Sequence, residues 1–268
     1  MSFHLAGVIP VAGIETDFNM PWHDCMMPIG PNYLAIERSV VECANAGCET
    51  IWIVCKNDIQ PLIKNRLGDY VQDPVWVVRR HEYKKREHQK IIPIFYVPLH
   101  PRDIKKRECV SWSILHGAHT AMHISANMSK WLKPNKFYVS FPYGVYRPSP
   151  ARENRNFISS KSGFFFVSDQ KTVKDGKYLG FTFDYEDYRA SVNWMKEQTI
   201  KQNKPIKNFS LQETFQFLNL RDCNLAEIEK YWAIDNWEDY CEYISSEGKK
   251  MKRPSKFVLV SKELNGIG

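Results

Sequence analysis

The sequence predicts an α/β protein with a mixed, mostly parallel sheet flanked by helices in one domain, and two observations support this prediction. The first 55 residues have the pattern of a strand, a helix and a second strand, which is the βαβ unit of a parallel sheet. Predicted strands and helices continue along the chain without an internal repeat or a linker, so one domain over residues 1–268 is the simplest partition.

Apolar runs and one glycine define the elements of the first half. A strand at residues 5–11 leads into a helix at residues 32–46, and Gly47 follows where a helix commonly ends in a left-handed residue. The unbroken apolar run TIWIVC, residues 50–55, is typical of a buried parallel strand. The remaining predictions here are a helix at 59–67, strands at 75–78 and 91–97, a long helix at about 106–130 and a strand at 137–141.

Turn and cap residues define the second half. The stretch after Phe141 is rich in Pro, Asn, Ser and Arg and predicts a loop that could border a binding site. Strands at residues 164–168 and 179–183 flank Asp175-Gly176, a hairpin signal, and a helix follows at residues 185–202. Ser210 with Glu213, and Asn224 with Glu227, have capping-box spacing and predict two more short helices.

Composition limits the possible partners and compartment. The chain has 43% hydrophobic residues, no apolar run long enough to span a membrane and no signal-peptide pattern at its start, so we expect a soluble cytoplasmic protein. Seven scattered cysteines without a CxxC pair predict buried free thiols. The net charge of +7 is concentrated in runs at residues 79–90 and 249–253, whose one aromatic residue is Tyr83, so nucleic-acid binding is not expected.

The segment from Val8 to Gly30 has the form of a phosphate-binding loop with unusual charges. Ala12 and Gly13 follow the first strand, where a residue without Cβ lets backbone N–H groups approach an anion. The same segment carries three carboxylates that would repel a triphosphate, Glu15, Asp17 and Asp24.

Three stretches together resemble the sugar-1-phosphate nucleotidyltransferases, which join a nucleoside triphosphate to a sugar phosphate on a GT-A-like α/β fold. VIPVAGIETDF with MMPIG is similar to the family's AAGxGTR and LPxG segments. HGAHTA looks like its GTAxA turn against the base and sugar, and YWAIDNWEDY is similar to its WxDxGTxEDY. The three stretches occur in the family's order and span nearly the whole chain.

The resemblance implies roles for individual residues. It implies a nucleotide or nucleotide sugar as ligand and Mg²⁺ or Mn²⁺ as cofactor, with Asp235 as a metal ligand and catalytic residue. The nucleotide- and sugar-binding residues that it implies are Ala12, Gly13, Gly117, His119 and Ala121.

The chain departs from the family at the positions that carry the chemistry. Asp17 stands where the family has an arginine and Asp24 where it has a lysine, so both are predicted site residues with altered charge. The family's Gly-Asp pair is absent from SFPYGVY after the fifth strand. Substitute cations would be needed, and the candidates are Lys56, Arg147 and Arg152.

Each candidate group also has a structural interpretation. The three loop acids could bind a divalent cation or simply face water, and Asp235 could cap the helix that follows it. Asp184, Glu186 and Asp187 could form a DxD-like metal site but also suit the first turn of a helix. His116, His119 and His123 share one helix face, yet one helix cannot easily surround a tetrahedral zinc ion.

The leading functional hypothesis is a divergent sugar-phosphate nucleotidyltransferase-like protein that forms or binds a nucleotide sugar and has an altered triphosphate site. Two alternatives stay open. One is a GT-A glycosyltransferase that uses a nucleoside diphosphate sugar, and the other is a non-catalytic binding or structural protein on the same fold. Whether the chain is an enzyme, which sugar or base it takes and its oligomeric state do not follow from the sequence.

Overall fold

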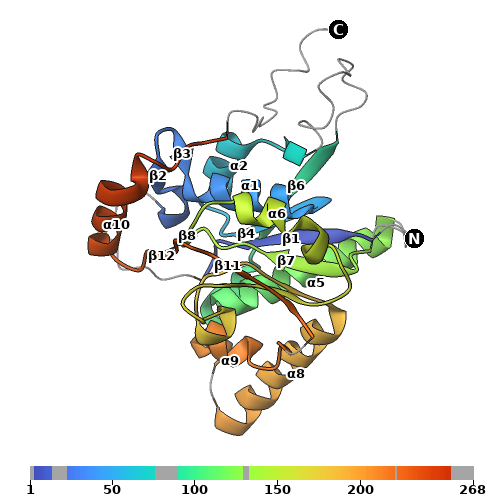
Figure 1. The fold of residues 1–268 in the computed structure, drawn as a ribbon. Coiled ribbons are helices and arrows are strands. Elements are labelled where there is room, and N and C mark those ends of the chain that lie inside the picture. The colour runs from blue at the N-terminus through green and yellow to red at the C-terminus, as the bar shows by residue number, and fades with distance from the viewer. Residues whose placement is uncertain are drawn as a thin grey trace, which may run out of the picture.

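The computed structural model describes residues 3–13, 23–75, 90–128, 133–203, 205–220 and 222–254, and these build a layered α/β unit around one large sheet. Within these ranges the large sheet has eight strands in the order β11-β9-β10-β7-β1-β4-β6-β5 (Figure 1). Its strands are β1 (Leu5–Pro10), β4 (Thr50–Cys55), β5 (Tyr70–Gln72), β6 (Ile91–Pro98), β7 (Lys136–Val139), β9 (Phe164–Val167), β10 (Phe181–Phe183) and β11 (Asn224–Glu227). The predicted mixed sheet with helices on its faces is confirmed.

Helices and two small hairpins complete the unit. The helices are α1 (Ala35–Ala46), α2 (Gln60–Leu67), α4 (Pro101–Arg107), α5 (Val110–Met128), α6 (Ser149–Glu153), α7 (Arg155–Ile158), α8 (Tyr185–Gln202), α9 (Leu211–Phe215) and α10 (Trp237–Tyr243). Short 3₁₀ or π turns are η1 (Asp24–Met26), η4 (Val173–Asp175), η5 (Ile206–Asn208) and η6 (Ile244–Gly248). The small pairs are β2 (Pro28–Gly30) with β3 (Tyr33–Leu34), and β8 (Gly144–Val145) with β12 (Trp232–Ala233).

The order of the parallel strands places a crevice at the carboxyl ends of the central strands. From β1 the chain moves to β4 and β6 on one side and then returns to β7 on the other side, so Val8 lies between Trp52 and Val139. In open α/β sheets, ligands bind where the strand order reverses, outside the carboxyl ends of the strands. We therefore expect a ligand site at the carboxyl ends of β1 and β7.

The helices cover the two faces of the sheet unequally. Every residue of α1 is buried on one face, and α5 packs on the other face against β1 and β4 (Figure 1). Gly117 permits this close approach, since a Cβ there would lie 2.8 Å from side-chain atoms of both Val8 and Val54. Gly47 ends α1 at φ 95°, as predicted.

A buried ion pair fixes the segment that follows β7. Arg38 and Glu42 of α1 are both fully buried, and their side chains lie 2.6 Å apart. Glu42 also accepts hydrogen bonds from Tyr138, Ser140 and Tyr146 at 2.5, 2.9 and 2.6 Å. Arg38 in addition donates to the carbonyl oxygen of Phe141. Removal of one partner from such a pair commonly costs about 3–5 kcal/mol, so this network should hold the crevice edge rigid.

Several local predictions are confirmed. The strand at residues 50–55 and the helix at residues 185–202 have the expected bounds. Ser210 caps α9 and pairs reciprocally with Glu213, as its spacing predicted.

Other local predictions are wrong, because long-range contacts override local signals. Asn224 and Glu227 belong to strand β11, paired with β9, rather than to a helix. The predicted helix at 106–130 is interrupted at Glu108 and Cys109, and the loop after Phe141 contains β8, α6 and α7. Val75 is helical rather than extended, while residues 76–78 of the predicted strand lie outside the described residues. By contrast, the predicted strands on either side of Asp175-Gly176 do pair antiparallel, as β9 and β10, and this dipeptide lies in a 3₁₀ turn that Gly176 closes at φ 85°.

Candidate functional site

The first loop places Gly13, but not Ala12, at a cavity. The backbone N–H groups of Val11 and Ala12 both donate to the carbonyl oxygen of Val54, at 2.9 and 3.0 Å. Ala12 is only 2% exposed, so its N–H is committed to the sheet rather than directed at an anion as predicted. Gly13 has φ 84°, and a Cβ there would lie 2.4 Å from the backbone of Cys109, so glycine is required for the chain to pass the start of α5.

A cavity of about 410 Å³ opens beside Gly13, at the carboxyl end of β1. Its wall includes Cys109 and Val110 at the start of α5, Gly176, Tyr178 and the segment Lys207–Gln212. Among the described residues that line this cavity, Lys207 is the one cation, and its side chain is exposed. The cavity lies where the fold predicts ligand binding, and its lining comes from four separate parts of the chain.

Two predicted acids lie on either side of a tyrosine pair next to this cavity. The rings of Tyr143 and Tyr178 are 6.3 Å apart, and Tyr178 also lines the cavity. Burial and then the charges of Cys25 and Asp24 raise the pKa of Tyr143, while burial and then the charge of Asp235 raise the pKa of Tyr178. The fold thus brings Asp24 and Asp235, which are far apart in sequence, to the same edge of the sheet.

Asp235 is not the helix cap that the sequence allowed. Asn236 caps α10 by accepting the Asp239 N–H at 2.9 Å. The Asp239 carboxylate accepts the Asp235 N–H at 3.2 Å and the Asn236 side chain at 2.9 Å. The Asp235 carboxylate therefore has no capping role, and partial burial together with the charge of Asp239 raises its pKa.

The described residues supply few ligands for a divalent cation. Glu15 and Asp17 lie outside the described residues, and within the described ranges no three His, Cys, Asp or Glu side chains form a metal-binding group. Mg²⁺ is commonly held by one or two carboxylates together with phosphate oxygens and water. Of the acids predicted to act at the site, the structure describes Asp24 near Tyr143 and Asp235 near Tyr178.

The HGAHTA segment is helical rather than a turn. Gly117 and Ala121 lie within α5 and are buried against the sheet and core, so the helix directs both away from the cavity. His119 is exposed on the outer face of α5, where its Nδ1 lies 3.3 Å from the Tyr188 hydroxyl. The turn predicted from the resemblance is wrong, because the helical run continues unbroken from Val110 to Met128.

The remaining predicted candidates have other partners. Lys56 forms an ion pair with Glu108 close to the carboxyl end of β4. Arg147 lines a different cavity, beside β11. Asp184 caps α8 by accepting the N–H groups of Glu186 and Asp187 at 2.8 and 3.0 Å, which confirms the helix interpretation of that acidic group.

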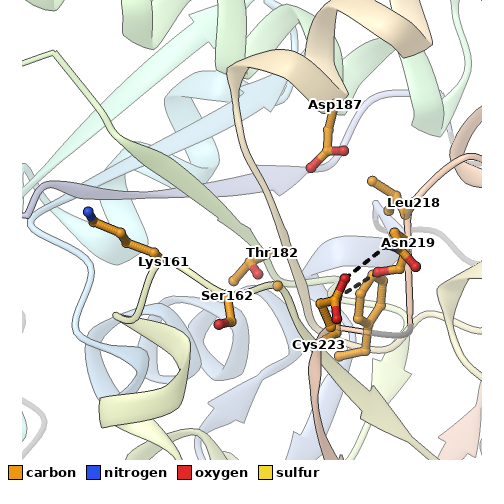
Figure 2. A pocket seen from close by; sticks show the side chains of 10 residues that line it. Lys161, Ser162, Thr182, Asp187, Leu218, Asn219 and Cys223 are labelled. Carbon is orange, nitrogen blue, oxygen red and sulfur yellow. Dashed lines mark hydrogen bonds between the residues drawn. The ribbon is translucent and has the colours of Figure 1, made fainter.

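A second cavity, of about 340 Å³, lies at the opposite end of the sheet (Figure 2). Beside it, the buried Lys136 ammonium donates to the carbonyl oxygens of Ile158, Ser160 and Ser162, at 3.3 and 3.1 Å for the first two. The Cys223 thiol donates to the Asn219 carbonyl oxygen at 2.6 Å. Both side chains thus donate to backbone carbonyl oxygens, and the Lys136 contacts tie the start of β7 to the segment before β9.

Sequence reasoning missed Lys207 and the tyrosine pair. Lys207 lies in η5, between two predicted helices, and no local pattern distinguishes it from other exposed lysines. Tyr143 and Tyr178 are separated by β9 and η4 in the chain, and only the sheet brings them together. Among the residues that line this cavity, the sequence singled out Gly13 as a turn residue and Ser210 as a helix cap.

Several solved structures have a similar fold. A Bacillus anthracis protein assigned as a glucose-1-phosphate thymidylyltransferase matches with a TM-score of 0.57 and 9% identity, over 94% of this chain and 98% of that one. UDP-glucose pyrophosphorylase in complex with UDP-glucose matches with 0.56 and 14%, over 93% and 100%. The 4-diphosphocytidyl-2C-methyl-D-erythritol synthase of Anaerococcus prevotii matches with 0.50 and 12%, over 91% and 95%.

The chain therefore has the fold of the sugar-phosphate nucleotidyltransferases. No protein-family model and no curated protein sequence matches it, so the likeness is one of fold. None of the described helices is both long and apolar enough to cross a membrane.

Proposed function

We propose that this protein binds a nucleotide sugar in the cavity beside Gly13 and is a divergent nucleotidyltransferase-like protein. The observation that carries the proposal is the position of this cavity, at the carboxyl end of β1 where the strand order reverses. Tyr178 and Lys207 would contact the ligand there, with Asp24 and Asp235 nearby.

The charge of the cavity favours a diphosphate ligand over a free triphosphate. Lys207 offers one positive charge, whereas Asp24 and Asp235 add negative charge at the same edge. A pair of like charges at contact distance costs about 4 kcal/mol in a partly solvated site, and a triphosphate adds more charge than a diphosphate sugar. A bound Mg²⁺ or Mn²⁺, held by Asp235 and phosphate oxygens, would offset this repulsion.

For nucleotidyl transfer, a phosphate oxygen of the sugar phosphate would attack the α-phosphorus of the triphosphate, and pyrophosphate would leave. Lys207 is placed to stabilise negative charge on a phosphate group in the cavity. Tyr178, which is half-buried, supplies a flat ring in the wall of the same cavity. The second candidate, glycosyl transfer from a nucleoside diphosphate sugar, would use the same cavity with fewer phosphate charges.

Thermal unfolding with a ligand panel tests binding. The panel contains nucleoside diphosphate sugars, and nucleoside triphosphates with sugar 1-phosphates, each with and without Mg²⁺ or Mn²⁺. We expect a nucleoside diphosphate sugar with metal to raise Tm, since a ligand at 100 times its Kd adds about 2.7 kcal/mol of stability. Lys207→Ala and Asp235→Asn should reduce that rise, whereas Lys201→Ala and Glu197→Gln on the exposed face of α8 should not.

The products of the same mixtures separate the mechanisms. Pyrophosphate release from a triphosphate and a sugar 1-phosphate indicates nucleotidyl transfer. Release of the nucleoside diphosphate from a nucleotide sugar, with the glycosyl group passed to water or to an added hydroxyl acceptor, indicates glycosyl transfer. Binding without either product indicates a non-catalytic binding protein. If no ligand in the panel stabilises the folded protein, the proposal is wrong.

A further inference from the structure

A separate cavity lies between α4, α5 and α8, on the outer side of the helical layer that covers the sheet. Its volume is about 340 Å³. Asp103 and Arg107 come from α4, Trp112 and His119 from α5, and Lys196 from α8. Leu115 and Val192 supply its apolar part. It shares no described lining residue with the cavity beside Gly13, so the two are separate sites.

Hydrogen-bond donors outnumber acceptors in this cavity. Lys196 is exposed and forms no ion pair with any described residue. The Arg107 guanidinium lies 4.7 Å above the centre of the Trp112 ring, and Arg107 also pairs with Asp103 at 3.5 Å. The indole N–H of Trp112 is buried and has no hydrogen-bond acceptor in the described part of the chain. Lys196 and Arg107 favour an anion, because both can donate charge-assisted hydrogen bonds to phosphate oxygens.

The histidines do not change this balance of charge. His116 lies 3.4 Å from the carbonyl oxygen of Pro98 through Nε2, and burial lowers the pKa of its imidazole. Asp103 is the described carboxylate in the lining, and it is already paired with Arg107. The cavity therefore keeps an excess of donors around neutral pH.

Flat rings border the same cavity. The rings of His119 and Tyr188 are 6.3 Å apart and nearly parallel, with an interplanar angle of 16°. The row continues to His123 on one side, at 6.2 Å, and to Tyr185 on the other, at 6.2 Å. His119 is exposed, so the edge of its ring is open to contact with a planar ligand.

We propose that this cavity is a second ligand site, for a small phosphate-bearing molecule with a planar ring, of the nucleoside monophosphate class. The phosphate would contact Arg107 and Lys196, and the ring would pack against the exposed edges of His119 and Tyr188. Acids near Tyr185, namely Asp184, Glu186 and Asp187, disfavour a longer polyanion along the row of rings. The proposal does not rest on the function proposed for the cavity beside Gly13.

Calorimetric titration of the whole protein with UMP, AMP, uridine and inorganic phosphate tests the site. We expect the monophosphates to bind at least about tenfold more tightly than uridine or phosphate. Only the monophosphates can contact both the cationic side chains and the aromatic side chains of the cavity. Lys196→Ala should weaken monophosphate binding about tenfold, as loss of a charge-assisted contact does. His119→Ala should weaken binding of the monophosphates but not of phosphate.

Two controls keep the result specific. Lys201→Ala removes an exposed lysine from the same helix and should leave monophosphate binding unchanged. Glu197→Gln, on the same exposed face of α8, should also leave monophosphate binding unchanged. Binding that disappears in Lys207→Ala but survives Lys196→Ala belongs to the other cavity and overturns the proposal. Absence of monophosphate binding to the folded protein overturns it as well.

Discussion

Two tyrosines only three residues apart have hydroxyl groups in opposite surroundings. Tyr143 and Tyr146 are both buried, at 0% and 1% exposed. The Tyr146 hydroxyl donates to Glu42 at 2.6 Å and accepts the Gly180 N–H at 3.1 Å. The Tyr143 hydroxyl has no hydrogen-bond partner among the described residues. One hydroxyl therefore stabilises the fold, whereas the other carries a desolvation cost.

Substitution of each tyrosine by phenylalanine should give opposite results. A buried hydroxyl without a partner costs about 1–3 kcal/mol, so Tyr143→Phe should leave the free energy of unfolding unchanged or raise it by about 1 kcal/mol. Tyr146→Phe should lower it by about 2 kcal/mol, because a hydrogen bond to a buried carboxylate is lost. Urea unfolding of both variants measures the difference, and a clear loss of stability in Tyr143→Phe would show that its hydroxyl has a partner.

At the scale of elements, two glycines have the same backbone conformation but different neighbours. Gly13 has φ 84° and Gly176 has φ 85°. A Cβ on Gly13 would lie 2.4 Å from the Cys109 backbone at the start of α5, whereas a Cβ on Gly176 would meet nothing within 4 Å. The pair therefore separates backbone strain from steric contact between elements.

Alanine at each glycine position should reveal that contact. Gly176→Ala should cost about 1 kcal/mol, the price of a left-handed conformation for a residue with Cβ. Gly13→Ala should cost about 2 kcal/mol more, because the loop or the start of α5 must also move. It should weaken ligand binding in the adjacent cavity more than Gly176→Ala does. Equal losses of stability, measured by urea unfolding, would contradict the contact between the β1 loop and α5.

At the scale of the whole molecule, buried thiols link stability to pH. Cys25, Cys43, Cys48, Cys55 and Cys109 are buried free cysteines, as the sequence predicted, while Cys223 is half-buried and Cys241 exposed. Burial raises the pKa of Cys55 to about 12 and that of Cys109 to about 11, and it also raises the pKa values of Cys25 and Cys43. An unfolded cysteine ionises near pH 8.5, as an approximate reference value. Above that pH the folded state therefore holds more protons than the unfolded state.

Stability should accordingly fall as pH rises from about 8.5 towards 11. Each protonated thiol lowers the free energy of unfolding by up to about 1.4 kcal/mol per pH unit. The four thiols together give a slope of up to about 5 kcal/mol per pH unit. Lys136 acts in the opposite direction, because burial lowers its pKa to about 8. Between pH 8 and about 10.4 the unfolded state therefore holds one more proton at this lysine than the folded state, and this contribution to stability rises with pH. Urea unfolding at pH 8.0, 9.0 and 10.0 measures the net fall. Cys241→Ser should keep the same slope, and a flat profile would contradict buried protonated thiols.

Local pattern was sufficient for the architecture of this protein. Apolar runs specified the buried strand at residues 50–55 and the helix at residues 185–202, and Gly47 marked the end of α1, because each depends on neighbours within a few residues. The alternation of such elements predicted the sheet and, with Gly13, the edge at which a ligand cavity lies. The roles predicted for Asp17, Asp24 and Asp235 stay predictions.

Only the tertiary structure decided which side chains meet at that edge. It placed Lys207 and Tyr178 in the cavity, buried Ala12, Gly117 and Ala121 against the sheet, and made a strand of residues 224–227. These outcomes depend on contacts between segments up to hundreds of residues apart, which no local spacing encodes. The sequence by itself therefore specified an α/β fold and the position of its crevice, whereas long-range packing specified the chemistry inside it.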